Sequence, residues 1–164
     1  MVHSNKRKLY IFTVISIAAM VILYQSNLIK RLISPKPKIL FFQHAGLGII
    51  TPEKLSGNCY SIHLSDLKAQ IIFFANEPAR TSGVMNWADF ALTWAHNDIY
   101  PNAMIHAFKD NKSVNDTVTL SNLHYDKINK TASYKACALD PKTKFAIGQL
   151  ADVSVFIDPF HPWP

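Results

Sequence analysis

The sequence predicts a mainly β protein, in which one N-terminal transmembrane helix precedes a small antiparallel β sandwich or open barrel with one helix packed on it. Three observations predict this architecture. A long uncharged segment lies near the N-terminus, segments rich in β-branched and aromatic residues recur at short spacing after it, and one segment follows the period of an amphipathic helix. With 164 residues, of which 49% are hydrophobic, the chain is long enough for one packed domain.

The uncharged segment, residues 9–29, has the length of a membrane span. As a helix it reaches about 31 Å, which matches the roughly 30 Å hydrocarbon core of a bilayer. The bases at positions 6–8 also suit the charged region of a signal peptide. Cleavage requires small residues before the cut, and the best site, after Ser26, has the bulky Tyr24 two residues earlier. We therefore expect an uncleaved signal-anchor, with secretion after cleavage as the alternative.

The charge of the chain is concentrated at its N-terminus. Of 17 bases and 11 acids, seven bases and no acid fall in residues 1–38, so residues 39–164 carry 10 bases and 11 acids and are nearly neutral. This distribution argues against a nucleic-acid partner for the folded part and favours a membrane partner for the first part. The seven bases are Lys6, Arg7, Lys8, Lys30, Arg31, Lys36 and Lys38.

These features predict four parts: a cytoplasmic tail (1–8), a signal-anchor (9–29), a linker (30–38) and an extracytoplasmic β domain (39–164). Three bases precede the span and four follow it, so the positive-inside count is nearly a tie. We place the short N-terminus inside because the long part after the span must form the domain. The expected location is the inner membrane, as a single-pass protein with its C-terminal domain in the periplasm.

The part after the linker is predicted to form a series of strands separated by turn residues. Residues alternate between apolar and polar in several of them, as a half-buried strand requires. Tyr60, Ile62 and Leu64 share one face of their segment, and residues 153, 155 and 157 repeat this pattern near the C-terminus. The predicted strands are Ile39–His44, Cys59–Leu64, Gln70–Ala75, Ala103–Phe108, Thr117–Leu123, Thr131–Leu139 and Asp152–Ile157.

One helix interrupts the strands. Asn86 is a suitable N-cap, and Asp89 lies in the first turn, near the positive end of the helix dipole. The helix is expected to end near residues 96–98, before a turn at Pro101. Its apolar face, which follows the i, i+3, i+4, i+7 rule, is formed by Trp87, Phe90, Ala91 and Trp94.

The two cysteines, Cys59 and Cys137, allow two interpretations. As a disulfide they would close a long loop, which stabilises a fold by on the order of 4 kcal/mol and suits an oxidising compartment. As free thiols they would be buried like other small apolar residues. The sequence leaves both open.

Five blocks occur in order along the chain and resemble a known family: IIFFANEPARTSG, ADFALTWAH, PNAMIHAF, VTLSNLHYDKINKTASYKA and VSVFIDPF. The family consists of small exported bacterial proteins of unknown function, with the patterns F-S-D-R-P-x-R, P-N-A, L-S-N-P-x-Y and F-I-D. The resemblance runs from about Leu64 to Pro159. It implies export and the boundary of the domain, and it carries no activity. The chain departs from the family where Glu77 replaces an Arg and Leu123 a Pro, whereas Arg80 is kept.

The stretch Asn76–Arg80 is interpreted first as a corner between a buried strand and the helix, because its proline presets a turn. Arg80 would then pair with Glu77 or Asp158. The functional alternative is an arginine that binds a carboxylate or phosphate. The helix face and the corner from Glu77 to Gly83 form the predicted contact surface. The residues predicted to bind a partner are Glu77, Arg80, Trp94, Asn102 and Asp158.

Neither a nucleophile elbow, a phosphate-binding glycine loop nor a His-Glu-x-x-His motif occurs. The sequence therefore favours a non-catalytic binding or envelope-associated module without cofactor, whose partners are the membrane through residues 9–29 and an envelope protein. One alternative is a periplasmic hydrolase that uses Asp158, His161 or Arg80.

A second alternative is metal handling through Met104, His106 and His161. Cys59 and His63 do not add to it, because four residues of a strand separate them by about 13 Å and they cannot share one ion. No metal site is predicted.

Overall fold

The computed structural model describes residues 39–53, 57–75, 80–95, 100–140, 142 and 145–160. The chain divides into two compact units, residues 1–36 and 37–164, and every described residue belongs to the second. The predicted tail, anchor and linker lie outside the described residues. Within them, no helix combines the length and the apolar character that a membrane span needs.

The described residues form eight strands and one helix, so the predicted antiparallel β domain with a single short helix is confirmed. Each of the seven predicted strands is present, and most are longer than expected. One further strand, β4, was not predicted. The elements are β1 (Ile39–Pro52), β2 (Cys59–Leu67), β3 (Gln70–Ala75), β4 (Thr81–Asn86), α2 (Trp87–Ala95), β5 (Asn102–Lys109), β6 (Lys112–Asp126), β7 (Thr131–Ala138) and β8 (Gly148–Phe160).

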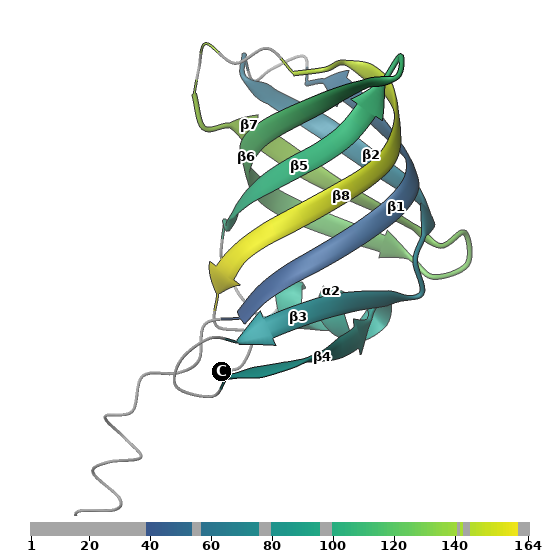
Figure 1. Ribbon diagram of the computed structural model, residues 1–164, viewed down its shortest axis with the longest axis vertical. Coiled ribbons are helices and arrows are strands. Elements are labelled where there is room, and N and C mark those ends of the chain that lie inside the picture. Colours follow the sequence, from purple (N-terminus) through teal and green to yellow (C-terminus); the bar gives the residue numbers. More distant parts are fainter. Residues whose placement is uncertain are drawn as a thin grey trace, which may run out of the picture. The chain divides into compact units, whose positions relative to one another are not determined.

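The sheet has the order β2-β7-β6-β5-β8-β1-β3-β4, and β1 also pairs with β2. Strands β1, β2, β7, β6, β5 and β8 therefore form a closed antiparallel barrel, as Figure 1 shows. The structure thus differs from the sandwich or open barrel expected from the sequence. Closure depends on β1, whose first residues, 39–42, pair with β3, whereas residues 45–52 pair with β2.

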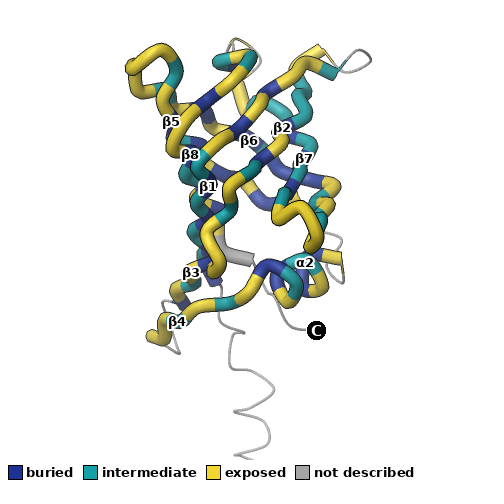
Figure 2. Tube along the Cα trace, turned by 90° about the vertical axis from the view of Figure 1, so that its right-hand side faces the viewer, coloured by how far each residue is buried: buried dark blue, intermediate teal, exposed yellow. Residues whose placement is uncertain are grey.

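Alternate residues of each barrel strand point into the core. Phe41, Gln43 and Ala45 of β1 are fully buried or nearly so, and the residues between them are more exposed. The alternation predicted for β2 and β8 is confirmed, because Ile62 and Leu64, like residues 153, 155 and 157, are buried. Figure 2 shows buried and exposed positions succeeding one another along the strands. The barrel interior is therefore filled with side chains.

Helix α2 covers one end of the barrel (Figure 2). Its predicted cap is confirmed: the Asp89 N–H donates to Asn86 Oδ1 at 2.8 Å, and Asn86 Nδ2 donates to Asp89 Oδ2 at 2.7 Å. The Phe90 ring meets the ring of Phe41 edge-on, with centroids 5.1 Å apart. The Trp94 ring meets that of Tyr134 at 5.5 Å. The helix thus extends the barrel core with aromatic side chains.

The segment before β8 packs at the opposite end. Phe145 is buried, and its ring lies 4.2 Å from that of Tyr60. The backbone of Ala146 hydrogen-bonds to Asp116, and the Lys109 ammonium donates to the Ile147 carbonyl oxygen. Burial raises the pKa of Asp116, and the hydrogen bond from Ala146 partly offsets this effect.

Candidate functional site

The predicted corner before Arg80 connects two paired strands, β3 and β4, instead of a strand and the helix. Ala75 of β3 pairs with Thr81 of β4, so the chain turns back on itself and enters α2 only after β4. Arg80 has a left-handed backbone, with a φ of 41°, as a tight turn requires. Glu77 lies outside the described residues. The expected corner between strand and helix is therefore wrong, because β4 intervenes.

Gly83, the last residue of the predicted contact corner, has a packing role. A Cβ built on it would lie 2.7 Å from Cζ of Phe73, the residue opposite it on β3. The Phe73 ring in turn lies 6.5 Å from that of Phe41 in the core. The absence of a side chain at position 83 thus lets the β3–β4 hairpin pack against the barrel.

Trp94 belongs to the core, since it is only 6% exposed and contacts Phe90 and Tyr134. It was expected on the contact surface, and the 3.6-residue period explains its burial: Trp94 shares the inward face of α2 with Phe90. The exposed face of the helix instead carries Asp89 and Leu92.

Asn102 and Asp158 are the two predicted residues that the structure brings together. The register pair Ala103–Ile157 joins β5 to β8, and both of its side chains are buried. Asn102 and Asp158 are the next residues of these two strands, so their side chains lie on the outer face, where both are exposed. Asn102 Oδ1 accepts a hydrogen bond from Thr119 Oγ1. Arg80 is distant from Asn102 and Asp158. Strands β3 and β1 lie between β4 and β8, so the width of sheet between β4 and β8 is about 14 Å.

An apolar row runs across the outer face of five strands. Direct register pairs link each member to the next: Met104 to Phe156, Phe156 to Phe42, Phe42 to Ile72, and Ile72 to Val84. Four of the five are exposed, Val84 to 54%, and the Phe42 and Phe156 rings lie 4.8 Å apart. This outer apolar row, which runs through β5, β8, β1, β3 and β4, is about 19 Å long.

The sequence contains a signal for this row, although the predicted contact surface did not include it. In β3 the apolar residues Ile71, Ile72, Phe73 and Phe74 are consecutive. Since successive residues of a strand face opposite sides, such a run must place apolar side chains on the outer face as well as the inner one.

The next row along the barrel is polar. His44 and His106 both pair in register with Ser154, one from each side, and His44 Nδ1 lies 3.3 Å from Ser154 Oγ. His106 Nδ1 lies 2.8 Å from Asn115 Oδ1. The outer apolar row is thus bordered by hydrogen-bonding groups, as at the rim of a protein interface.

Inside the barrel, Tyr134 donates a hydrogen bond to Gln43 Oε1 at 2.8 Å, whereas Gln43 Nε2 has no partner among the described residues. Burial raises the pKa of Tyr134, and the hydrogen bond to Gln43 opposes the shift. The phenol therefore stays protonated and acts as a donor. Both side chains are sealed from solvent, so the pair specifies packing and offers no access to a substrate.

Cys59 and Cys137 form a disulfide that joins β2 to β7 at a direct register pair. The described residues contain no group of three or more His, Cys, Asp or Glu side chains that could hold a metal ion. Met104 and His106 lie on the outer face of β5, and His161 lies outside the described residues.

These features define a closed antiparallel β-barrel domain that is capped by a helix and carries an apolar outer face. Comparison of the chain with family models, curated proteins and solved structures found no match. The resemblance to small exported proteins stays a prediction.

Proposed function

We propose that this protein is a membrane-anchored, extracytoplasmic binding module without catalytic activity, and that its outer apolar row docks on another envelope protein. The observation that carries the proposal is the row itself: five apolar side chains in register across five strands. Large contiguous apolar patches on an otherwise polar surface mark sites of interaction.

The chemistry of this face favours a protein partner over lipid headgroups. Anionic headgroups attract clustered Lys and Arg side chains. The row contains neither, and its neighbours His44, Ser154 and His106 are hydrogen-bonding groups without a Lys or Arg among them. An apolar centre with such a border is the usual composition of a protein–protein interface.

The position of the row along the chain supports a partner in the envelope. Phe42 lies three residues after the start of β1, which is about 10 Å of strand. A nine-residue linker, positions 30–38, separates β1 from the predicted anchor, and such a linker spans at most about 30 Å. A protein in or near the same membrane is therefore within reach of the row.

Site-specific photo-crosslinking tests the partner. A photoreactive residue replaces Ile72 or Met104 in the full-length chain, and Ile128, which is 91% exposed on the β6–β7 hairpin, serves as the control position. We expect one heterologous protein adduct from both row positions and none from position 128. The adduct at position 104 should weaken when Val84 is changed to Ser. Adducts to lipid alone, adducts only to a second copy of the chain, or equal yields at position 128 would refute the proposal.

The compartment has a separate test. A disulfide between Cys59 and Cys137 suits an oxidising compartment, which supports placement of the domain in the periplasm. A reporter that is active only outside the cytoplasm, fused after residue 164, should be active, and its activity should sediment with the inner membrane. Activity in the culture medium would instead support secretion after cleavage. A reporter that is active in the cytoplasm would exclude both the anchored and the secreted form.

A further inference from the structure

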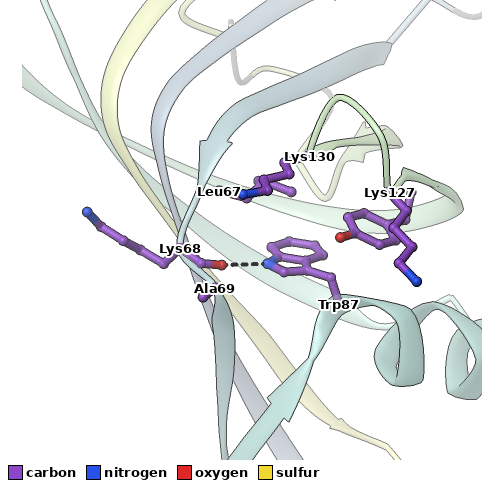
Figure 3. A pocket seen from close by; sticks show the side chains of 7 residues that line it. Leu67, Lys68, Ala69, Trp87, Lys127 and Lys130 are labelled. Carbon is purple, nitrogen blue, oxygen red and sulfur yellow. Dashed lines mark hydrogen bonds between the residues drawn. The ribbon is translucent and has the colours of Figure 1, made fainter.

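A pocket of about 280 Å³ lies at the end of the barrel that α2 covers. Three segments that are distant in the sequence meet around it: the β2–β3 connection, the first residue of α2, and the β6–β7 hairpin. It shares no residue with the outer apolar row. Its lining residues are Leu67, Lys68, Ala69, Trp87, Tyr125, Lys127 and Lys130, of which Figure 3 labels six.

One wall of the pocket is aromatic and fixed in place. Trp87 is 3% exposed, and its Nε1–H donates to the Lys68 carbonyl oxygen at 2.9 Å (Figure 3). Its ring lies nearly parallel to that of Tyr125, with centroids 5.8 Å apart and planes 21° apart. Because hydrogen bonding and stacking already hold both rings, a planar ligand can pack against Tyr125 and the small exposed part of Trp87 without ordering new side chains.

The rim of the pocket is cationic. Lys127 and Lys130 project from the β6–β7 hairpin, Lys130 toward Leu67 and Lys127 toward α2, whereas the Lys68 side chain extends away from the other lining residues (Figure 3). Within the described part of the chain, no carboxylate pairs with these ammonium groups, whereas Lys135 forms an ion pair with Glu53.

The acid nearest in sequence to these lysines is already engaged. Both Asp126 oxygens accept hydrogen bonds, from the backbone N–H groups of Ile128 and Asn129 and from Asn129 Nδ2. These bonds hold the turn that carries Lys127 and Lys130. The two ammonium groups therefore stand beside an aromatic wall on a fixed hairpin, without a partner anion among the described residues.

We propose that this pocket binds a small organic anion with a planar apolar body. The planar part packs against the Trp87–Tyr125 pair, and the carboxylate or other anionic group is attracted to the cationic rim that Lys127 and Lys130 form. The volume suits one or two fused rings, because pockets for larger drug-sized ligands start at about 300 Å³. The lysines are exposed, so charge adds a modest share of the affinity and selects the sign of the ligand.

Three probes with the same ring separate the effects of shape and charge: 2-naphthoate, 2-naphthalenemethanol and 2-naphthylmethylammonium. Each is titrated into the full-length chain in phosphatidylcholine nanodiscs, and binding is followed by the NMR signal of the Trp87 Nε1–H. We expect 2-naphthoate to shift this signal saturably, the alcohol to bind several-fold more weakly, and the ammonium probe to give no shift. Raising NaCl from about 50 to about 500 mM should weaken only the naphthoate.

Matched charge variants localise the site. Lys127→Gln with Lys130→Gln should weaken naphthoate binding about five- to tenfold, since each exposed pair adds up to about 1 kcal/mol. Lys112→Gln with Lys142→Gln removes the same charge outside the pocket and should leave the affinity unchanged. An unshifted Trp87 signal in the probe-free variants shows that the pocket is intact.

Three results would overturn the proposal: equal affinity for all three probes, unchanged naphthoate affinity in the pocket variant, or a Trp87 signal that no probe shifts saturably. None of them bears on the protein partner, which is tested at the outer apolar row.

Discussion

Gly83 lies against the ring of Phe73, and this contact leaves no room for a side chain at position 83. Replacing Gly83 by Ala would place a methyl group 2.7 Å from Phe73 Cζ. The ring, which packs against that of Phe41, would have to shift, and such overpacking costs about 1–3 kcal/mol. We expect Gly83→Ala to lower the free energy of unfolding by this amount in urea titrations. Gly57→Ala is the matched control, because a Cβ there meets nothing within 4 Å.

Gln43 and Tyr134 form a buried pair, joined by a hydrogen bond that gives the phenol an acceptor and Gln43 Oε1 a donor. Tyr134→Phe removes the donor to Gln43 Oε1 and leaves a buried acceptor without a partner, which should cost about 1–3 kcal/mol. Gln43→Leu alone should cost a similar amount, because the phenol then lacks its acceptor. We expect the double variant to be more stable than the sum of the two losses predicts. Additive losses in this cycle would contradict the coupling.

The residue-level predictions from the sequence succeeded where the chemistry is local. Asn86 and Asp89 were expected to form a helix cap, and both hydrogen bonds are present. Trp94 was correctly placed on the apolar face of the helix with Phe90, but it was also expected to bind a partner, and the period alone does not decide between the two roles. Whether that side meets the barrel or a partner depends on the fold.

Strand β4 shows why an element can escape prediction. Its residues, Thr81–Asn86, include Gly and Asn, which have low strand propensity, and they follow Pro78 in the sequence. The segment is extended because β3 pairs with it over six positions, from Gln70–Asn86 to Ala75–Thr81. Strand β1 also continues beyond its predicted end at His44, through Gly46 and Gly48, because β8 and β2 pair with it on both sides. Pairing with neighbouring strands therefore explains both the presence of β4 and the length of β1.

The β6–β7 hairpin should respond to acid through Asp126. Hydrogen bonds from the backbone and side chain of Asn129, and from the backbone of Ile128, lower the pKa of this carboxyl below its ordinary value. The ionised form therefore stabilises the turn above about pH 4, and this contribution is lost as the pH falls through the lowered pKa. We expect the hydrogen-exchange protection of Ile128 and Asn129 to decrease at pH 2–3. In Asp126→Asn this decrease should be absent.

The contribution of Asp116 to stability depends on pH in the opposite sense to that of Asp126. Burial raises its pKa, so the folded state binds a proton more tightly than the unfolded chain does. Its contribution to stability is present at low pH and is lost as the pH rises through the raised pKa. Asp116→Asn keeps an acceptor for the Ala146 N–H and removes the buried charge. We expect this variant to be at least as stable as the native chain at pH 7 by urea unfolding, and a marked loss there would contradict the argument.

At the scale of the whole molecule, ring closure is the property that sequence patterns predict least well. The alternation of apolar residues identified the strands and their inner faces, but the order of strands around the barrel depends on contacts between distant segments. The β1–β2 pairing, which closes the ring, involves residues with two glycines and a proline, Ala45–Pro52, that carry no strong strand signal. The outer apolar row likewise emerges only from register, because its five members come from five strands.

The Cys59–Cys137 disulfide should stabilise this closed ring strongly, because it links residues 78 positions apart. A cross-link of that span restricts the unfolded chain and is worth about 4 kcal/mol by loop entropy, while β2 and β7 stay paired through their backbones in the folded state. We expect Cys59→Ala with Cys137→Ala to keep the barrel and to lower the free energy of unfolding by about this amount. Reductant should destabilise the native chain to the same degree and leave the double variant unchanged. If reductant also lowered the free energy of unfolding of the double variant, the effect of reductant could not be assigned to the disulfide, and the predicted stabilisation by this cross-link would be contradicted.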